Sequence, residues 1–167
     1  GGEKLKDEVR TLWQEKFGIR IFEGYGTTEM SPVISLNTPL FNRIGTVGKF
    51  LPGIEWKMEA VDGILGGGNL LIKGANAMSG YLLHDQGFVP KEEWYNCGDV
   101  VQVDEDGFIT IKSRLKRFAK ISGEMVSLDA VEKAAEECFG VDGNAAINVS
   151  DDKKGGRIVL YTMHRRA

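Results

Sequence analysis

The chain has 167 residues, of which 42% are hydrophobic and 27% are charged, and its formal net charge is −3 from 21 basic and 24 acidic residues. These values are typical of a folded globular protein rather than a disordered chain, and the near-balance of charge gives no electrostatic reason to expect a nucleic acid or an anionic membrane as the main partner. No apolar run approaches the roughly 18–20 residues of a membrane-spanning helix and no signal-peptide core begins the chain, so we expect a cytoplasmic protein.

The N-terminal part is predicted to belong to an α/β layer. Residues 3–17 have the spacing of an amphipathic helix that Gly18 can cap, and its apolar stripe comprises Leu5, Val9, Leu12, Trp13 and Phe17. Residues 19–22 form a short apolar run typical of a buried strand, and a polar loop with two glycines follows at residues 23–29. In α/β layers with this order of elements, ligands bind beyond the strand ends.

Between residues 43 and 113 the pattern changes to that of antiparallel β structure. Short alternating segments at residues 56–60, 70–73, 100–103 and 108–112 lie between glycine-rich turns. Residues 104–107, Asp-Glu-Asp-Gly, have the composition of a hairpin turn, with glycine where positive φ is expected. We therefore expect an antiparallel sheet or a small β-barrel here.

Residues 114–167 are predicted to form a small α+β unit. A basic cluster at its start consists of Arg114, Lys116, Arg117 and Lys120. Ser127 is a suitable N-cap for a helix that reaches Phe139, and two strands are expected at residues 145–149 and 157–163. Because the chain begins directly before a helix and ends just after a strand, we expect it to be a piece of a larger protein.

The segment Tyr25-Gly26-Thr27-Thr28-Glu29 is the sharpest candidate for a ligand site. A tyrosine ring can stack on a flat heterocycle, and a glycine lets backbone N–H groups approach an anion. Threonine hydroxyls can bond phosphate oxygens, and a carboxylate can hold Mg²⁺ through oxygen ligands. The alternative is an ordinary polar loop after a strand.

Three further features each have a competing structural explanation. Asp99, after Gly98, can accept two hydrogen bonds from a ribose diol, although a turn is the commoner reason for Gly-Asp before a strand. Cys97 has no nearby histidine, so we prefer a half-buried thiol over a nucleophile. The basic cluster is small for an acidic chain, which favours a solvated connector or an anionic-ligand site over a nucleic-acid patch.

Taken in order, these segments resemble the motifs of the adenylate-forming superfamily, which includes acyl-CoA synthetases, luciferases and nonribosomal peptide adenylation domains. The matching segments are residues 25–29 (Y-G-x-T-E), 45–53 (G-x-x-G…P-G), 74–82 (G-x-x-x-M-x-G-Y-L), 98–99 ([ST]-G-D) and 114–124 (G-R-x-[KD]…K-x-x-G-E). Residues 116–127 look closest to bacterial acyl-[acyl-carrier-protein] synthetases, which are often fused to a 2-acylglycerophosphoethanolamine acyltransferase of phospholipid metabolism.

The resemblance implies a fold and a reaction. Residues 1–113 would be the α/β end of a large AMP-binding domain with its β-barrel subdomain, and residues 114–167 the start of a small mobile α+β domain. The implied enzyme is a ligase that activates a carboxylic acid, for which we expect a fatty acid, with ATP and Mg²⁺ to acyl-AMP. It then transfers the acyl group to the pantetheine thiol of an acyl carrier protein, or to coenzyme A in an acyl-CoA ligase.

By motif match, the resemblance assigns the 25–29 segment to the nucleotide. Tyr25 would stack on adenine with Gly26 beside it, Thr28 would bond phosphate, and Glu29 would hold Mg²⁺. Phosphoryl chemistry depends mostly on positioning and charge stabilisation, which is what such residues supply.

The remaining assignments concern the ribose and the second half-reaction. The resemblance implies that Asp99 and Arg114 bind the ribose hydroxyls, that Lys116 is the hinge about which the small domain rotates, and that Gly123 lines the pantetheine path. A parent protein at the inner face of the membrane is compatible with this class.

The sequence also departs from the family pattern. Cys97 stands where the motif has Ser or Thr, and Ser113 replaces the usual Gly before Arg114. The family's phosphate loop would lie before residue 1 and its catalytic lysine after residue 167, so we expect the chain by itself to hold half a nucleotide site and to be inactive. A non-catalytic nucleotide-binding or interaction module is the alternative from a different functional class.

Overall fold

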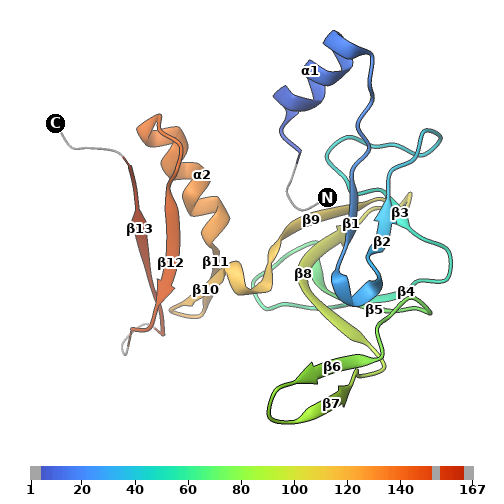
Figure 1. Cartoon of the computed structure of the whole chain (residues 1–167). Coiled ribbons are helices and arrows are strands. Elements are labelled where there is room, and N and C mark those ends of the chain that lie inside the picture. The colour runs from blue at the N-terminus through green and yellow to red at the C-terminus, as the bar shows by residue number, and fades with distance from the viewer. Residues whose placement is uncertain (1–4, 152–154, 164–167) are drawn as a thin grey trace.

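A computed structural model describes residues 5–151 and 155–163, and Figure 1 shows their arrangement. The chain begins with helix α1 (Asp7–Phe17), which has two acidic residues in its first turn and ends at Gly18. Gly18 has φ 65° and its N–H donates to the Gln14 carbonyl at 3.0 Å, as predicted for a C-terminal cap. No helix in the described part of the chain is long and apolar enough to cross a bilayer.

The apolar stripe of α1 is not buried by any described residue. Leu12 is 52% exposed and Phe17 is 55% exposed, although both belong to the apolar stripe of the predicted amphipathic helix. The helix is held instead by polar contacts, in which Arg10 Nη2 donates to Glu23 Oε2 at 2.6 Å.

The predicted strand at residues 19–22 is wrong, because this segment has no regular structure. The chain first becomes extended at β1 (Gly24–Gly26), which pairs antiparallel with β2 (Val33–Leu36), and β2 pairs antiparallel with β3 (Lys49–Phe50). A short apolar segment is a strand only where a neighbouring strand supplies hydrogen bonds, and none of the described strands pairs with residues 19–22. All described strand pairs are antiparallel, so the expected α/β layer is not formed among these residues.

The central feature is a four-stranded antiparallel sheet in the order β4-β5-β8-β9. Its strands are β4 (Glu55–Glu59), β5 (Gly68–Lys73), β8 (Tyr95–Val103) and β9 (Ile109–Arg114), which confirms the four alternating segments of the sequence. The main core packs against this sheet and comprises Met30, Ile34, Leu70, Ile72, Val101 and Ile109. Between β8 and β9, Gly107 has φ 84° and its N–H donates to the Asp104 carbonyl at 2.9 Å, as the predicted turn requires.

The expected β-barrel is not closed in the described structure. The β1-β2-β3 sheet and the four-stranded sheet meet beside Ile109 of β9. There the Val47 N–H donates to the Ile109 carbonyl at 2.8 Å, and the Ile109 N–H donates to the Gly48 carbonyl at 2.9 Å. The opposite edge stays open because β4 pairs only with β5, and every residue of β4 is exposed. The β1-β2-β3 sheet and the four-stranded sheet therefore remain two open sheets and do not form one closed barrel.

A separate hairpin of β6 (Gly80–Leu83) and β7 (Gly87–Pro90) extends from the four-stranded sheet (Figure 1). Its base is fastened by the Lys91 N–H, which donates to the Ser79 carbonyl at 3.1 Å. Gly66, with φ 71°, lies in the bend before β5, whose first residue is Gly68.

The C-terminal unit has its own small core of Ala119, Leu128 and Ala146. It contains a short 3₁₀ helix (Leu115–Arg117), the hairpin β10 (Phe118–Ile121) and β11 (Glu124–Ser127), helix α2 (Leu128–Phe139), and the hairpin β12 (Ala145–Val149) and β13 (Arg157–Tyr161). The predicted cap of α2 is confirmed, since the Ala130 N–H donates to Ser127 Oγ at 3.2 Å. The β10–β11 hairpin was not predicted, and the domain boundary at residues 113/114 stays a prediction.

Candidate functional site

The 25–29 segment is placed at the end of the β1–β2 hairpin. A Cβ at Gly26 would lie 1.7 Å from the Pro32 carbonyl oxygen, so the two strands can approach this closely only with glycine at that position. The next residues, Thr28–Met30, form a single 3₁₀ turn that ends at Ser31, with φ 48°. The close packing of this hairpin is therefore sufficient by itself to require glycine at residue 26.

Tyr25 reaches across to the four-stranded sheet. Its hydroxyl donates to Asp99 Oδ2 at 2.5 Å, and the Asp99 side chain is only 6% exposed. Arg114, the cross-strand partner of Asp99 on β9, has its Nε 3.5 Å from Asp99 Oδ1 but is itself 79% exposed. Three residues predicted to bind the nucleoside are thus brought together, with Asp99 at their centre.

A bulge in β8 places Asp99 there. Asn69 of β5 pairs with Val100, but Leu71 pairs with Asn96, so one residue of β5 faces three residues of β8. Gly98, in the middle of these three, has φ 66° and donates its N–H to Asn96 Oδ1 at 2.8 Å. Bulges of this kind redirect side chains and are common beside functional sites.

Burial keeps the groups around Asp99 protonated. Desolvation, followed by the nearby Cys97 and Asp99, raises the pKa of Tyr25 well above its usual range, so its hydroxyl stays a hydrogen-bond donor. Desolvation is also the largest cause that raises the pKa of the Cys97 thiol from 9.0 to about 12. A thiol of this kind is a poor nucleophile, which agrees with the half-buried structural role preferred for Cys97.

Glu29 lies in the 3₁₀ turn beside two other tyrosines, Tyr81 and Tyr95. The Tyr81 hydroxyl donates to Glu29 Oε1 at 3.0 Å. The pKa of Glu29 is lowered, first by its own backbone N–H and then by the hydroxyls of Tyr81 and Tyr95. Glu29 is therefore ionised at neutral pH, while Thr28 next to it is exposed.

This carboxylate is a suitable ligand for a nucleotide-bound Mg²⁺. Within residues 5–151 and 155–163, no cluster of three or more His, Cys, Asp or Glu side chains can hold a metal by protein ligands alone. Mg²⁺ in nucleotide sites is usually held by one or two carboxylates together with substrate phosphates and water. A single ionised Glu29 fits that pattern, in which the nucleotide supplies the other ligands.

Lys116 and Gly123 are not brought to the Tyr25–Asp99 contact. Lys116 is exposed in the 3₁₀ helix that follows Arg114, and Gly123 is exposed in the turn between β10 and β11 with φ 96°. Sequence reasoning missed Tyr81 and Tyr95 as neighbours of Glu29. The signal was present for Tyr81, since it lies in the 74–82 segment whose pattern was recognised without a role.

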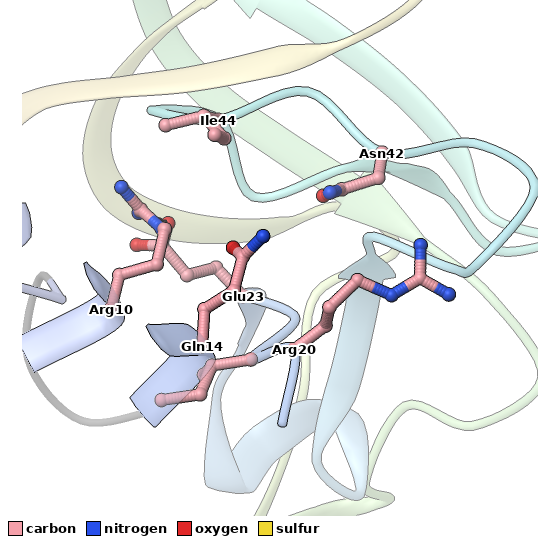
Figure 2. A pocket seen from close by; sticks show the side chains of 7 residues that line it. Arg10, Gln14, Arg20, Glu23, Asn42 and Ile44 are labelled. Carbon is pink, nitrogen blue, oxygen red and sulfur yellow. Dashed lines mark hydrogen bonds and ion pairs between the residues drawn. The ribbon is translucent and has the colours of Figure 1, made fainter. Parts of the chain in front are cut away.

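Two hollows of the described structure lie elsewhere. Figure 2 shows a small pocket between α1 and the loop that carries Asn42 and Ile44, with Arg10, Glu23 and Gln14 along its wall. A wider, open groove lies between the end of β4 and the β10–β11 hairpin, lined by residues that include Lys120 and Met125. Neither is lined by Tyr25, Glu29 or Asp99.

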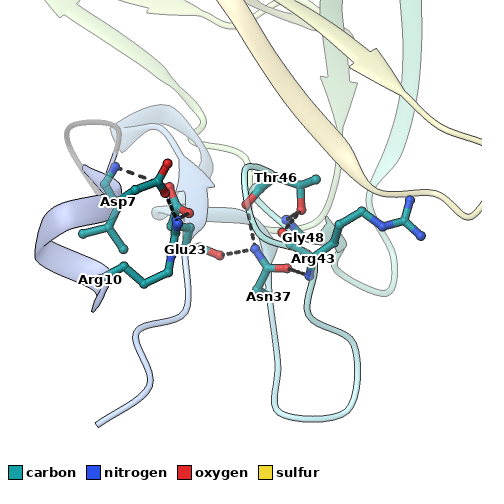
Figure 3. Close-up of polar contacts among 8 residues, drawn as sticks. Asp7, Arg10, Glu23, Asn37, Arg43, Thr46 and Gly48 are labelled. Atoms are coloured by element: carbon teal, nitrogen blue, oxygen red, sulfur yellow. Dashed lines mark hydrogen bonds and ion pairs between the residues drawn. The ribbon is translucent and has the colours of Figure 1, made fainter. Parts of the chain in front are cut away.

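The pocket beside α1 is part of a structural network (Figure 3). Asn37 Nδ2 donates to the Glu23 carbonyl at 3.1 Å and to the Thr46 carbonyl at 2.7 Å, and the Arg43 N–H donates to Asn37 Oδ1 at 3.0 Å. Asn37 is 2% exposed, so these bonds satisfy a buried amide. The network fastens the N-terminal segment to the 37–48 loop.

Comparison with known proteins gives one consistent class. Residues 1–82 match the family model of AMP-binding enzymes. The chain is 30% identical over 174 aligned residues to the long-chain-fatty-acid–CoA ligase of Salmonella typhimurium, a match that covers 99% of this chain and 31% of that enzyme. These matches bear out the superfamily resemblance seen in the motifs.

Solved structures agree in fold. The o-succinylbenzoate CoA synthetase from Bacillus subtilis, in complex with its acyl-adenylate intermediate, aligns with 92% of this chain and 33% of its own at 25% identity and a TM-score of 0.70. The anthranilate CoA ligase AuaEII, in complex with anthranoyl-AMP, aligns with 95% of this chain and 32% of its own at 26% identity and a TM-score of 0.68.

Over residues 1–82 this chain is similar to AMP-binding enzymes, and over nearly its whole length it is similar to CoA ligases. The chain spans about a third of the length of the relatives it matches.

Proposed function

We propose that this chain is part of an acid–thiol ligase that activates a carboxylic acid with ATP and passes the acyl group to a thiol. In the first step a carboxylate oxygen of the acid attacks the α-phosphorus of ATP, pyrophosphate leaves, and acyl-AMP forms. In the second step a thiolate attacks the acyl carbonyl carbon and AMP leaves. The contact that carries the proposal is the one between Tyr25 and Asp99, which joins two family motifs at one surface.

In this function the chain's residues bind and orient the nucleotide. Asp99 would accept hydrogen bonds from the ribose hydroxyls on the side that faces Arg114, because its other oxygen is already bonded to Tyr25. The hydroxyl contact also fixes the ring of Tyr25, whose face would stack on adenine and whose neighbour Gly26 would allow close approach. Thr28, being exposed, would bond a phosphate oxygen.

Glu29 would hold Mg²⁺, which when bound neutralises charge that develops on the phosphate oxygens. Lys116 would act as the hinge of the C-terminal unit, and Gly123 would lie along the path of the pantetheine arm in the second step. Both are exposed, as a hinge and a path for an incoming thiol require.

We infer coenzyme A as the acceptor, because the enzymes to which the chain is similar are CoA ligases. A long-chain fatty acid is the inferred substrate, since the relative at 30% identity acts on long-chain fatty acids. The pantetheine thiol of an acyl carrier protein is the second candidate acceptor. It is favoured by residues 116–127, which resemble carrier-protein loading enzymes, and a membrane-associated parent with a fused acyltransferase belongs to that alternative.

The test is ATP–pyrophosphate exchange by the full-length parent over carboxylic acids of increasing chain length, followed by thioester formation with coenzyme A or carrier protein. We expect exchange to be greatest with a long-chain acid and thioester to form with coenzyme A. Thioester only with carrier protein would select the second acceptor. Nucleotide binding without exchange for any acid would contradict the ligase and favour a non-catalytic binding module.

A further inference from the structure

The 74–82 segment carries a family-like pattern, yet none of the proposed roles uses it. The structure lays this segment along the 3₁₀ turn that contains Glu29. Asn76 Nδ2 donates to the Met30 carbonyl at 2.6 Å, and the Met78 N–H donates to the Glu29 carbonyl at 2.8 Å. Two backbone oxygens of the turn are thus held by residues that lie almost fifty positions later in the sequence.

The third contact reaches the functional atom itself. Tyr81, at the start of β6, donates its hydroxyl to Glu29 Oε1 at 3.0 Å. The same segment therefore fixes both the main chain and the carboxylate of Glu29, which leaves the side chain little freedom to turn away. Gly74 fits this docking, because a Cβ there would lie 2.7 Å from Asn76 Oδ1 and 2.8 Å from Ile54 Cδ1.

We propose that Tyr81 is a positioning residue for the divalent cation, which holds the Glu29 carboxylate aimed at the site where the nucleotide phosphates and Mg²⁺ would bind. The inference rests on the proposed function, and it assigns the 74–82 segment the task of keeping Glu29 in place.

Removing the Tyr81 hydroxyl should weaken the metal site without removing it. In the full-length parent, Tyr81→Phe should raise the Mg²⁺ concentration for half-maximal pyrophosphate exchange about three- to tenfold, the effect of losing one partly exposed hydrogen bond to a charged group. Direct binding of Mn²⁺, followed by electron paramagnetic resonance with a non-hydrolysable ATP analogue present, should weaken by the same factor.

The matched control is Tyr161→Phe, which removes a hydroxyl from a 59% exposed tyrosine on β13 and should change neither the Mg²⁺ requirement nor the binding of Mn²⁺. Tyr81 is itself 44% exposed, so its replacement by phenylalanine should leave the fold intact, and circular dichroism of both variants checks this.

The outcomes separate this inference from the function on which it rests. If Glu29→Ala abolishes exchange while Tyr81→Phe changes neither the Mg²⁺ requirement nor the binding of Mn²⁺, the role of Tyr81 is overturned and the ligase stands. If Glu29→Ala leaves exchange and Mn²⁺ binding intact, the metal role of Glu29 fails and that of Tyr81 fails with it. A loss of kcat in Tyr81→Phe that added Mg²⁺ does not restore would also contradict the inference.

Discussion

The Tyr25 hydroxyl donates a 2.5 Å hydrogen bond to Asp99, a residue 74 positions later that a bulge in β8 turns into the interior. The contact joins the β1–β2 hairpin to the four-stranded sheet and leaves the other oxygen of Asp99 facing Arg114. Tyr25, proposed to contact adenine, is therefore connected to Asp99 and Arg114, which are proposed to contact ribose. A substitution at one of them should alter the contacts of the others.

Replacing Tyr25 by phenylalanine should destabilise the chain and weaken nucleotide binding. Asp99 is 4% exposed, so removal of its hydroxyl donor leaves a buried carboxylate short of one partner, at a cost of about 1–3 kcal/mol. Urea unfolding measures this cost, with Tyr161→Phe as the control for loss of a tyrosine hydroxyl at an exposed position. Equal unfolding free energies for the two variants would show that the bond to Asp99 is not needed.

The two glycines of the candidate site should respond differently to alanine. Gly26→Ala forces a Cβ to 1.7 Å from the Pro32 carbonyl oxygen, so we expect a loss of about 3 kcal/mol. Gly98→Ala meets open space and suffers only from its φ of 66°, so we expect about 1 kcal/mol. Thermal or urea unfolding gives the order, and a greater loss for Gly98→Ala would mean that the β8 bulge, not the hairpin contact, is the tighter constraint.

The two cysteines should differ in reactivity. With its pKa raised to about 12, Cys97 holds only about one thiolate in ten thousand at pH 8, whereas Cys138 is exposed on α2. Iodoacetamide at pH 8 should therefore label Cys138 first, as peptide mass spectrometry can follow. In urea both should react at similar rates, and fast labelling of Cys97 in the folded chain would contradict its assigned environment.

Replacement of Arg117 and of Lys116, two neighbouring cations of the basic cluster, should affect stability differently. Arg117 donates to Asp129 at 2.8 Å, to Glu132 at 2.5 Å and to the Ala146 carbonyl at 3.2 Å, so Arg117→Met should cost about 1–2 kcal/mol of folding free energy. Lys116 is exposed, and Lys116→Met should change stability by less than about 0.5 kcal/mol.

The effects on activity should have the reverse order, with the direct loss in Lys116→Met rather than in Arg117→Met. In the full-length parent, Lys116→Met should slow thioester formation from supplied acyl-AMP, whereas any effect of Arg117→Met should follow its loss of stability. If Lys116→Met leaves both half-reactions unchanged, the hinge assignment is wrong.

Local patterns predicted the local structure well. The alternating segments became β4, β5, β8 and β9, and both helix caps and the 104–107 turn formed as expected, because each depends on a few neighbouring residues. The strand expected at residues 19–22 did not form, and the expected barrel did not close, because both depend on which strand lies alongside and that is not written in a local pattern.

The candidate site shows the same division. Its residue types were readable from motifs, but the bulge that aims Asp99 depends on how β8 pairs with β5. The bond between Tyr81 and Glu29 joins residues 52 positions apart, so no spacing within one segment could reveal it.

The central claim is that Glu29 belongs to the catalytic surface of an acid-activating ligase. Its most direct test is acid-dependent ATP–pyrophosphate exchange by the full-length parent and by its Glu29→Ala variant, with Glu105→Ala, an exposed carboxylate in the β8–β9 turn, as the matched control. We predict that the parent and the Glu105→Ala variant exchange pyrophosphate and that Glu29→Ala does not. Exchange that persists undiminished in Glu29→Ala would contradict the account.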